Sequence, residues 1–333
     1  MLTHMRSRLR SATLLSSSIA LLVLASSTAL TSCHAFGHTR QIALITPTAT
    51  TELWKGMHAG AYKAAREEGV RLYWNGATQE GDVERQIEIV ERKVRQCVAG
   101  IVLVPAHASQ LISAIAEARD ANVPVALAAT RLAEPLPSQV PTVMNNEEKT
   151  GELAADYIAR LVPSGEVAIV GVSPSNSSTL ERVRAFENAM RRYPDRTIVE
   201  RSYTGPNSFF GGEFDPALLL NRHPDLRAIF SPTLEGTRVA YALLRQNKGA
   251  GRIHLVVCEQ DAEEFEPLRR GEIDAIVAID VFQIGYRATR LLLHPHDPTT
   301  AVHQVVDPIL VTWSNVQTPA IQHALRPYAG FDR

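Results

Sequence analysis

The stretch that decides the fold is Ile42-Ala-Leu-Ile-Thr-Pro-Thr-Ala-Thr-Thr-Glu-Leu-Trp-Lys-Gly-Met-His-Ala-Gly-Ala61. Its four apolar residues, Ile42 to Ile45, predict a buried β-strand, and a polar turn follows them. The segment after the turn has Trp54 near its start and small residues further on, which predicts a helix. A strand followed by a helix of this kind is the building block of a parallel sheet covered by helices.

The same alternation of strand and helix continues to about residue 311. We predict further strands at Val70–Tyr73, Gly100–Val104, Val123–Leu127, Glu166–Val170, Ile198–Val199, Ala228–Phe230, His254–Val257, Asp274–Ala278 and within 305–311. Helices are expected around 87–94, 111–118, 149–161, 178–193, 214–222, 236–246, 262–270 and 282–293. Apolar strands between amphipathic helices are typical of α/β proteins with doubly wound parallel sheets. So many strands predict two such sheets, with a ligand site where the carboxyl ends of their strands face each other.

The composition argues against a nucleic-acid-binding protein, and the motifs argue against an enzyme, so together they favour a binding protein. The chain has 333 residues, 45% of them hydrophobic and 21% charged, with a formal net charge of −1. This is ordinary for a globular protein of about two domains. It offers no basic stripe for a nucleic acid, and no such partner is expected. There is no GxSxG elbow, no P-loop and no GxGxxG after a strand. The histidines are scattered and the cysteines do not cluster, so we expect no metal and no cofactor.

The N-terminus has the pattern of a secretory signal peptide, which we assign to residues 1–33. Three arginines between Arg6 and Arg10 precede an uncharged, largely apolar stretch from Ser11 onward. The stretch ends in Leu30-Thr31-Ser32-Cys33, which resembles a bacterial lipobox. We therefore predict lipid attachment at Cys33, a location on the periplasmic or extracellular face, and membrane contact through the lipid anchor only. A plain signal peptide and an uncleaved membrane helix are the alternatives, and the serines in the stretch disfavour the second.

The two remaining cysteines, Cys97 and Cys258, lie far apart in the sequence and in different repeating units. A disulfide between them would suit an oxidising compartment, but sequence alone does not establish its geometry. We expect two partly buried free thiols instead.

The segment Ile42–Ala61 resembles the first unit of the ribose-binding-protein family, which are type I periplasmic binding proteins related to the effector domains of lac-repressor-type regulators. Further segments resemble the family in the same order: Gln86–Val90, Gly100–Pro105, Ala121–Val125, Gly151–Ile158, Glu181–Phe186, His223–Phe230 and Asp280–Gly285. The resemblance covers residues 41–313.

This resemblance implies two lobes joined by three hinge crossings, near Val143–Asn146, Gln283–Ile284 and Asp307–Pro308. The N-terminal lobe would comprise 40–145 and 284–307, and the C-terminal lobe 146–283 and 308–318. The lobes would close over a ligand by a hinge motion.

The resemblance also implies a function. The protein would bind a small polar ligand, such as a sugar, and deliver it to the permease of an ABC transporter. The alternative is a periplasmic sensor that docks on a histidine kinase or chemoreceptor.

The resemblance places the first ligand-binding candidates on the N-terminal lobe. Trp54 would stack on the apolar face of a sugar, although it could instead pack its own helix. Thr51 would hydrogen-bond the ligand or cap that helix. The family has an aspartate at the end of the fourth strand, where this chain has Ala129 followed by Thr130 and Arg131. Arg131 would reach the ligand only if the loop shifts by one residue.

The other candidates lie on the C-terminal lobe. Arg182 would bind the ligand or form a salt bridge within the lobe, and Glu259 would accept ligand hydroxyls or act as a structural acid. Asn207, with Phe209 and Phe210 as alternatives, would contribute from the loop 205–212. The set is completed by Thr233 and Gln283. Since the aspartate is lost while arginines are kept, a ligand with an anionic group is one alternative left open.

Overall fold

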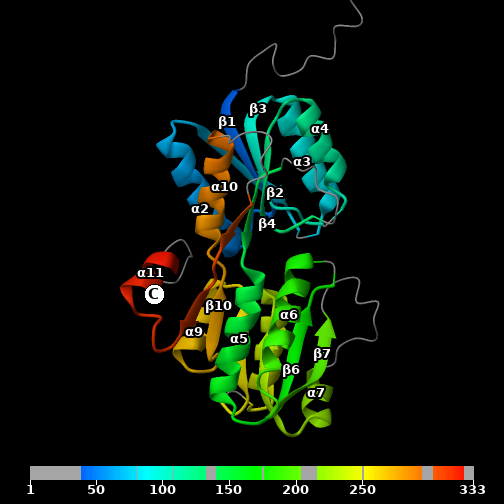
Figure 1. The fold of residues 1–333 in the computed structure, drawn as a ribbon, viewed down its shortest axis with the longest axis vertical. Coiled ribbons are helices and arrows are strands. Elements are labelled where there is room, and N and C mark those ends of the chain that lie inside the picture. The colour runs from blue at the N-terminus through cyan, green and yellow to red at the C-terminus, as the bar shows by residue number, and fades with distance from the viewer. Residues whose placement is uncertain are drawn as a thin grey trace, which may run out of the picture.

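Two lobes are stacked along the long axis of the protein, each built on a six-stranded sheet (Figure 1). The structure is a computed structural model that describes residues 39–79, 81–107, 109–132, 140–174, 176–203, 216–249, 251–294 and 303–325. The predicted architecture of two α/β lobes is confirmed.

The first lobe contains a parallel sheet in the order β11-β5-β4-β3-β1-β2. Its strands are β1 (Thr39–Thr48), β2 (Arg71–Ala77), β3 (Val98–Leu103), β4 (Val125–Ala129), β5 (Thr142–Asn145) and β11 (His303–Val306). Its helices are α2 (Glu52–Glu67), α3 (Val83–Arg95), α4 (Ile112–Asp120) and α10 (Val281–Leu293). In β1, Ile42 and Leu44 face α2 and α10, whereas Ala43 and Ile45 face α3 and α4. Both faces are apolar, as expected for a sheet covered on both sides.

The second lobe repeats this plan with the order β12-β10-β9-β8-β6-β7. Its strands are β6 (Gly165–Val172), β7 (Arg196–Tyr203), β8 (Leu226–Ser231), β9 (His254–Cys258), β10 (Ala275–Ala278) and β12 (Ile309–Thr312). Its helices are α5 (Glu147–Leu161), α6 (Ser177–Met190), α7 (Pro216–Arg222), α8 (Leu234–Gln246), α9 (Ala262–Arg269) and α11 (Pro319–Leu325). The helices α5 and α6 cover one face, and α8, α9 and α11 contribute to the core on the other.

The chain passes between the lobes three times, from β5 to α5, from β10 to α10 and from β11 to β12. The side-chain amide of Asn146, at the first passage, donates a hydrogen bond of 2.8 Å to Asp307 at the third. Strand β12 is antiparallel to β10, which the sequence analysis did not predict. Because β11 continues directly into β12, the chain enters the second sheet from the end where the other strands finish. The exact residue boundaries of the lobes stay a prediction.

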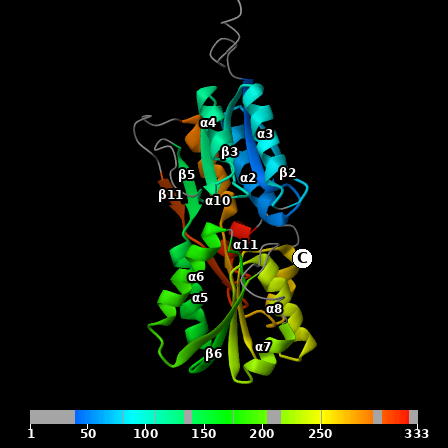
Figure 2. The ribbon, with the colours of Figure 1, turned by 90° about the vertical axis from the view of Figure 1, so that its right-hand side faces the viewer.

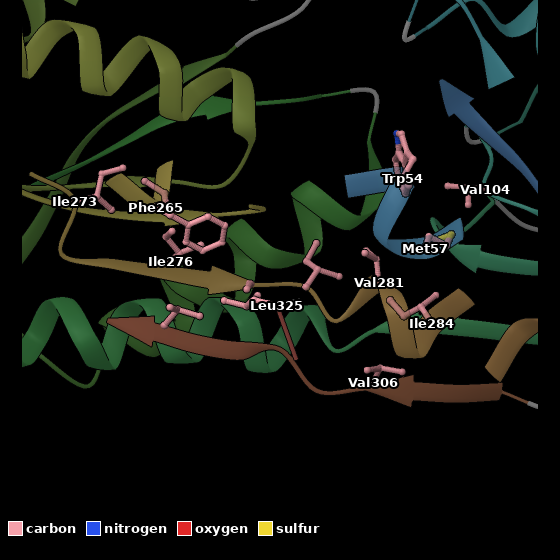
Figure 3. Packing of buried hydrophobic residues seen from close by; sticks show 14 of the residues in the cluster. Trp54, Met57, Val104, Phe265, Ile273, Ile276, Val281, Ile284, Val306 and Leu325 are labelled. Carbon is pink, nitrogen blue, oxygen red and sulfur yellow. The ribbon is translucent and has the colours of Figure 1, made fainter. Parts of the chain in front are cut away.

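One hydrophobic cluster is shared by the two lobes (Figure 3). It includes Trp54 and Met57 in the first lobe and Phe265 and Ile276 in the second. Val281, at the start of α10, lies between the two groups of side chains (Figure 3). The core of this face is therefore continuous through the passage from β10 to α10.

Gly60, near the end of the fold-deciding stretch, and Gly285 in α10 allow α2 and α10 to pack closely. A Cβ atom at Gly60 would overlap the backbone carbonyl of Phe282, and one at Gly285 would overlap the carbonyl of Met57. Only glycine fits at these two positions without moving a backbone.

Cys258 is a buried free thiol at the end of β9. Cys97 takes part in a disulfide, so it is not free and is not bonded to Cys258. The expectation of free thiols is therefore wrong for Cys97. Among the described residues, no helix is long and apolar enough to cross a membrane.

Candidate functional site

The carboxyl ends of the two sheets meet at the junction between the lobes, where α6 begins close to the first lobe (Figure 2), next to the end of β4. The hydroxyl of Ser177 donates to the carbonyl of Arg131, and the hydroxyl of Ser178 donates to the carbonyl of Ala129, both at 3.3 Å. The Arg131 guanidinium lies 3.6 Å from the carboxylate of Glu181. These three contacts join the lobes directly. The sequence analysis missed both serines and Glu181, although the polar run Ser175–Thr179 before a predicted helix was a signal for them.

Two residues at the junction have a left-handed backbone that is unusual outside glycine. They are Ala129, with φ of 61°, at the end of β4, and Glu259, with φ of 63°, directly after β9. The strands β4 and β9 hold equivalent places in the two sheets. Such a conformation costs about 1–2 kcal/mol per residue and is typically kept where surrounding structure fixes it, often at functional sites.

The start of α2 contributes Thr51 and Trp54. Thr51 precedes the helix, but its side chain makes no capping hydrogen bond. Its hydroxyl is buried and has no hydrogen-bond partner in the described part of the chain, which makes it available to a ligand. The Trp54 ring is 7% exposed and packs in the shared cluster beside Met57 and Val104 (Figure 3). The packing alternative for Trp54 is thus observed, and stacking on a ligand stays a prediction.

Arg182 is the largest fully buried side chain at the junction, with 1% of its side chain exposed. Its guanidinium makes a two-pronged ion pair with Glu147, at 2.8 and 3.2 Å, and also reaches Glu259 at 3.2 Å. It donates a further hydrogen bond to the carbonyl of Pro232. Although burial lowers the pKa of Arg182, the neighbouring carboxylates, Glu147 foremost, more than offset this and raise it, so the guanidinium stays charged. The intralobe salt bridge that the sequence left open is therefore present.

Glu259 is fixed by the protein at both oxygens. Its Oε1 accepts from Arg182, and its Oε2 accepts from the backbone N–H of Leu234 at 3.1 Å, at the start of α8. The side chain remains 20% exposed, so one edge of the carboxylate is still accessible. A carboxylate has about four acceptor positions, and these two bonds leave the others for a ligand.

Thr233 caps α8. Its hydroxyl accepts from the N–H of Gly236 at 3.1 Å and donates to the carbonyl of Gly171 at 2.7 Å. The residue is 8% exposed and its single hydroxyl hydrogen is already used. This arrangement accounts for Thr233 structurally, and its predicted contact with a ligand stays untested.

Gln283 and Thr130 are partly buried at the junction. The backbone N–H of Gln283 donates to the carboxylate of Asp280 at 3.0 Å. The carboxamide of Gln283 and the hydroxyl of Thr130 make no hydrogen bond to any residue that the structure describes. Both are free to bind a ligand. The predicted residues Asn207, Phe209, Phe210 and Cys33 lie outside the described residues.

Acidic side chains surround the second-lobe part of the junction. Burial is the main cause of the raised pKa of Asp261, and Glu263 and Glu52 add to it. Since Glu52 lies in the first turn of α2, the starts of α2 and α9 are within electrostatic reach of each other. Burial also raises the pKa of Asp280, and that of Glu264 well above its usual value. Within the described ranges, no group of three or more acidic, histidine or cysteine side chains could hold a metal ion.

Comparison with known proteins identifies the family. The model of a family described as a periplasmic binding protein domain matches residues 42–294. The D-ribose/D-allose-binding protein of Pseudomonas aeruginosa is 27% identical over 224 residues, which is 65% of this chain and 69% of that protein. The D-apiose import binding protein of Actinobacillus succinogenes is 24% identical, with 76% and 78% of the two chains covered.

Solved structures show the same fold. A carbohydrate transporter solute binding protein from Agrobacterium radiobacter, in complex with D-arabinose, superposes with a TM-score of 0.74 at 24% identity. The match covers 86% of this chain and 99% of that one. A solute binding protein from Agrobacterium vitis, bound with α-D-tagatopyranose, gives a TM-score of 0.75 at 22% identity, covering 85% and 98%.

Two α/β lobes with polar groups at their junction are the architecture of a two-lobed solute-binding protein. The family match covers more than half of the chain, so the protein belongs to the periplasmic binding protein domain family. Members of this family are solute-binding proteins for transport, and they are located outside the cytoplasm. The predictions of a type I periplasmic binding protein and of a non-enzymatic function are confirmed.

Proposed function

We propose that this protein binds a sugar at the lobe junction and delivers it to the permease of an ABC transporter. The observation that carries the proposal is the similarity to the D-ribose/D-allose-binding protein, because its 224 matched residues exceed the length of either lobe. The similarity therefore includes residues on both sides of the junction. The similarity to the D-apiose import binding protein favours import over the sensor alternative.

The described residues supply the contacts that a sugar needs. Sugar hydroxyls are desolvated when the lobes close, and each bond left unmade costs about 1–3 kcal/mol. Thr51, Thr130 and Gln283 provide a hydroxyl or carboxamide without a described partner, and Glu259 provides a carboxylate edge. Trp54 lies in the same region with an aromatic ring. The predicted roles of Asn207, Thr233 and Arg182 remain to be tested with them.

Direct contacts between the two lobes also contribute to closure. We infer that the bonds of Ser177, Ser178 and Arg131 to the opposite lobe form when the lobes close and break when they open. Arg131 then strengthens closure through Glu181 rather than through the ligand. A hinge motion of this kind is the usual way in which two lobes sequester a ligand.

A thermal-shift screen tests the proposed function. Purified protein is heated with pentoses, hexoses, polyols, sugar acids and nucleosides, each at high concentration. A ligand present at about 100 times its Kd stabilises the folded protein by roughly 2.7 kcal/mol. This corresponds to a rise of about 5 °C in Tm for a protein of this size. If nucleosides alone raise the Tm and no sugar does, the proposal is wrong.

We also propose that the mature protein is held at the membrane by a lipid on Cys33, in which the thioether takes the place of any disulfide between Cys33 and Cys97. The support is the sequence pattern Leu30–Cys33 and the extracytoplasmic location of the family.

A further inference from the structure

The arginines that the sequence offers to the ligand are already paired with acids. Arg131 lies 3.6 Å from Glu181, and Arg182 is bound by both Glu147 and Glu259. Glu147 and Glu259 carry two negative charges against the one positive charge of Arg182, so this network has a net charge of −1. It reaches solvent through Glu259, because Arg182 and Glu147 are only 1% and 4% exposed.

The geometry of Arg182 makes it a support for Glu259. Four N–H groups of its guanidinium point at protein acceptors on Glu147, Pro232 and Glu259. An arginine has five such groups, so almost none of its binding capacity is left. Glu259 stands on a left-handed backbone, and the bond from Arg182 holds its carboxylate in place.

The network also lies close to the ligand region. Arg182 is on α6, one turn beyond Ser178, which touches the opposite lobe. Glu147 begins α5, directly after the passage from β5, so it ties Arg182 to the hinge.

We propose that Arg182, Glu147 and Glu259 form a charge-selecting network, in which Arg182 is a positioning residue, Glu147 neutralises it, and Glu259 presents a carboxylate to the ligand. The site then accepts uncharged sugars, whose hydroxyls donate to a carboxylate, and rejects sugars that carry a carboxylate or phosphate. An anionic ligand, left open by the sequence, is excluded by this arrangement. The inference rests on the proposed sugar-binding function.

The test compares matched pairs of ligands by isothermal titration calorimetry. The pairs are D-ribose with D-ribose 5-phosphate, D-glucose with D-glucuronate, and D-galactose with D-galacturonate. For the pair whose uncharged member binds, we expect the wild-type protein to bind the anionic member roughly 100-fold more weakly. The ratio of the Kd of the anionic member to the Kd of the uncharged member also reflects the size of the added group. The critical measurement is therefore how this Kd ratio changes in the variants.

Two variants remove one acid each without changing its shape. Glu259→Gln is expected to weaken binding of the uncharged sugar and to shift the ratio toward the anionic ligand by roughly tenfold or more. Glu147→Gln is expected to shift the ratio in the same direction, although Glu147 does not touch the ligand. Glu147→Asp, which keeps the charge, should preserve the wild-type ratio. Folding of each variant is checked by circular dichroism, and Glu259→Gln serves alone if Glu147→Gln does not fold.

The matched control is Glu187→Gln, which makes the same charge change on α6 at a surface ion pair with Arg201. Its ratio should equal that of the wild type. The inference is overturned if the wild type prefers an anionic sugar, or if the ratio is unchanged in the Gln variants that fold. Either result leaves sugar binding intact. Binding of no sugar of either kind would instead refute the proposed function, and the inference with it.

Discussion

Replacing Arg182 by methionine tests the central ion pair of the second lobe. Methionine keeps much of the aliphatic stem but removes the charge. Glu147, which is 4% exposed, then has a buried charge without its partner. Breaking a buried pair from one side costs about 3–5 kcal/mol, so we expect Arg182→Met to lower the free energy of unfolding by that amount. The loss of the bond to Glu259 lowers the free energy of unfolding by less, since Glu259 is 20% exposed and keeps its bond to Leu234.

The double variant Arg182→Met with Glu147→Gln separates charge from packing. Removing both charges of a buried pair is often nearly neutral, so the double variant should recover roughly 2 kcal/mol of the loss. The measurement is urea unfolding followed by far-UV circular dichroism without ligand. Because both residues lie in the second lobe, the change is expected in the transition of that lobe.

The control for this experiment is Arg201→Met, which breaks the surface pair with Glu187. Exposed pairs contribute about 0–1 kcal/mol, so the control should stay within that range. A loss below about 1 kcal/mol for Arg182→Met, or a double variant less stable than the single one, would refute the account of Arg182 as a buried, doubly paired cation.

Three further predictions concern single residues. Trp54→Ala should weaken sugar binding by about 1–3 kcal/mol in calorimetry, whereas normal affinity with reduced stability would assign the ring to packing alone. Cys33→Ala should move the protein from the membrane fraction to the soluble fraction; a Cys33 peptide recovered disulfide-linked to Cys97 would contradict lipidation, since one sulfur cannot make both bonds. The folded-state pKa of Glu264 lies well above the usual 4.5, so the folded protein binds this proton more tightly and loses stability as pH rises above that value. Glu264→Gln should therefore raise the Tm at pH 8 and leave it unchanged at pH 4, and an equal shift at both would show that burial of this charge is not the cause.

The fold was predictable because its signals are local. The apolar run Ile42–Ile45 predicts the first strand by itself, and the segment with Trp54 and the small residues after it predicts the helix α2, in which Gly60 contacts α10 closely. The strand β12 was predicted, but its antiparallel direction was not, because a strand of four residues carries no sign of its direction. That direction is set by the passage from β11, which is a property of the whole topology.

The candidate site was harder because the partner of a polar side chain is chosen by the tertiary structure. Arg182 meets Glu147, 35 positions away, and Glu259, 77 positions away. The sequence offered both roles for Arg182 without a means to choose. Thr233 was predicted at the correct end of its strand, yet its hydroxyl binds Gly171, 62 positions away.

The equivalent strands β4 and β9 show why the two sides of the site differ. Each ends in a left-handed residue, so the same backbone device is present in both lobes. In the second lobe this residue is Glu259, whose strain is compensated by Arg182 and by the N-terminus of α8. In the first lobe it is Ala129, whose methyl group can make no hydrogen bond and whose carbonyl accepts one from Ser178. The first lobe therefore offers the ligand neutral groups such as Thr51, and the second lobe offers the carboxylate of Glu259. A neutral, hydroxyl-rich ligand can bridge these two groups on closure without burying a second charge beside Glu259.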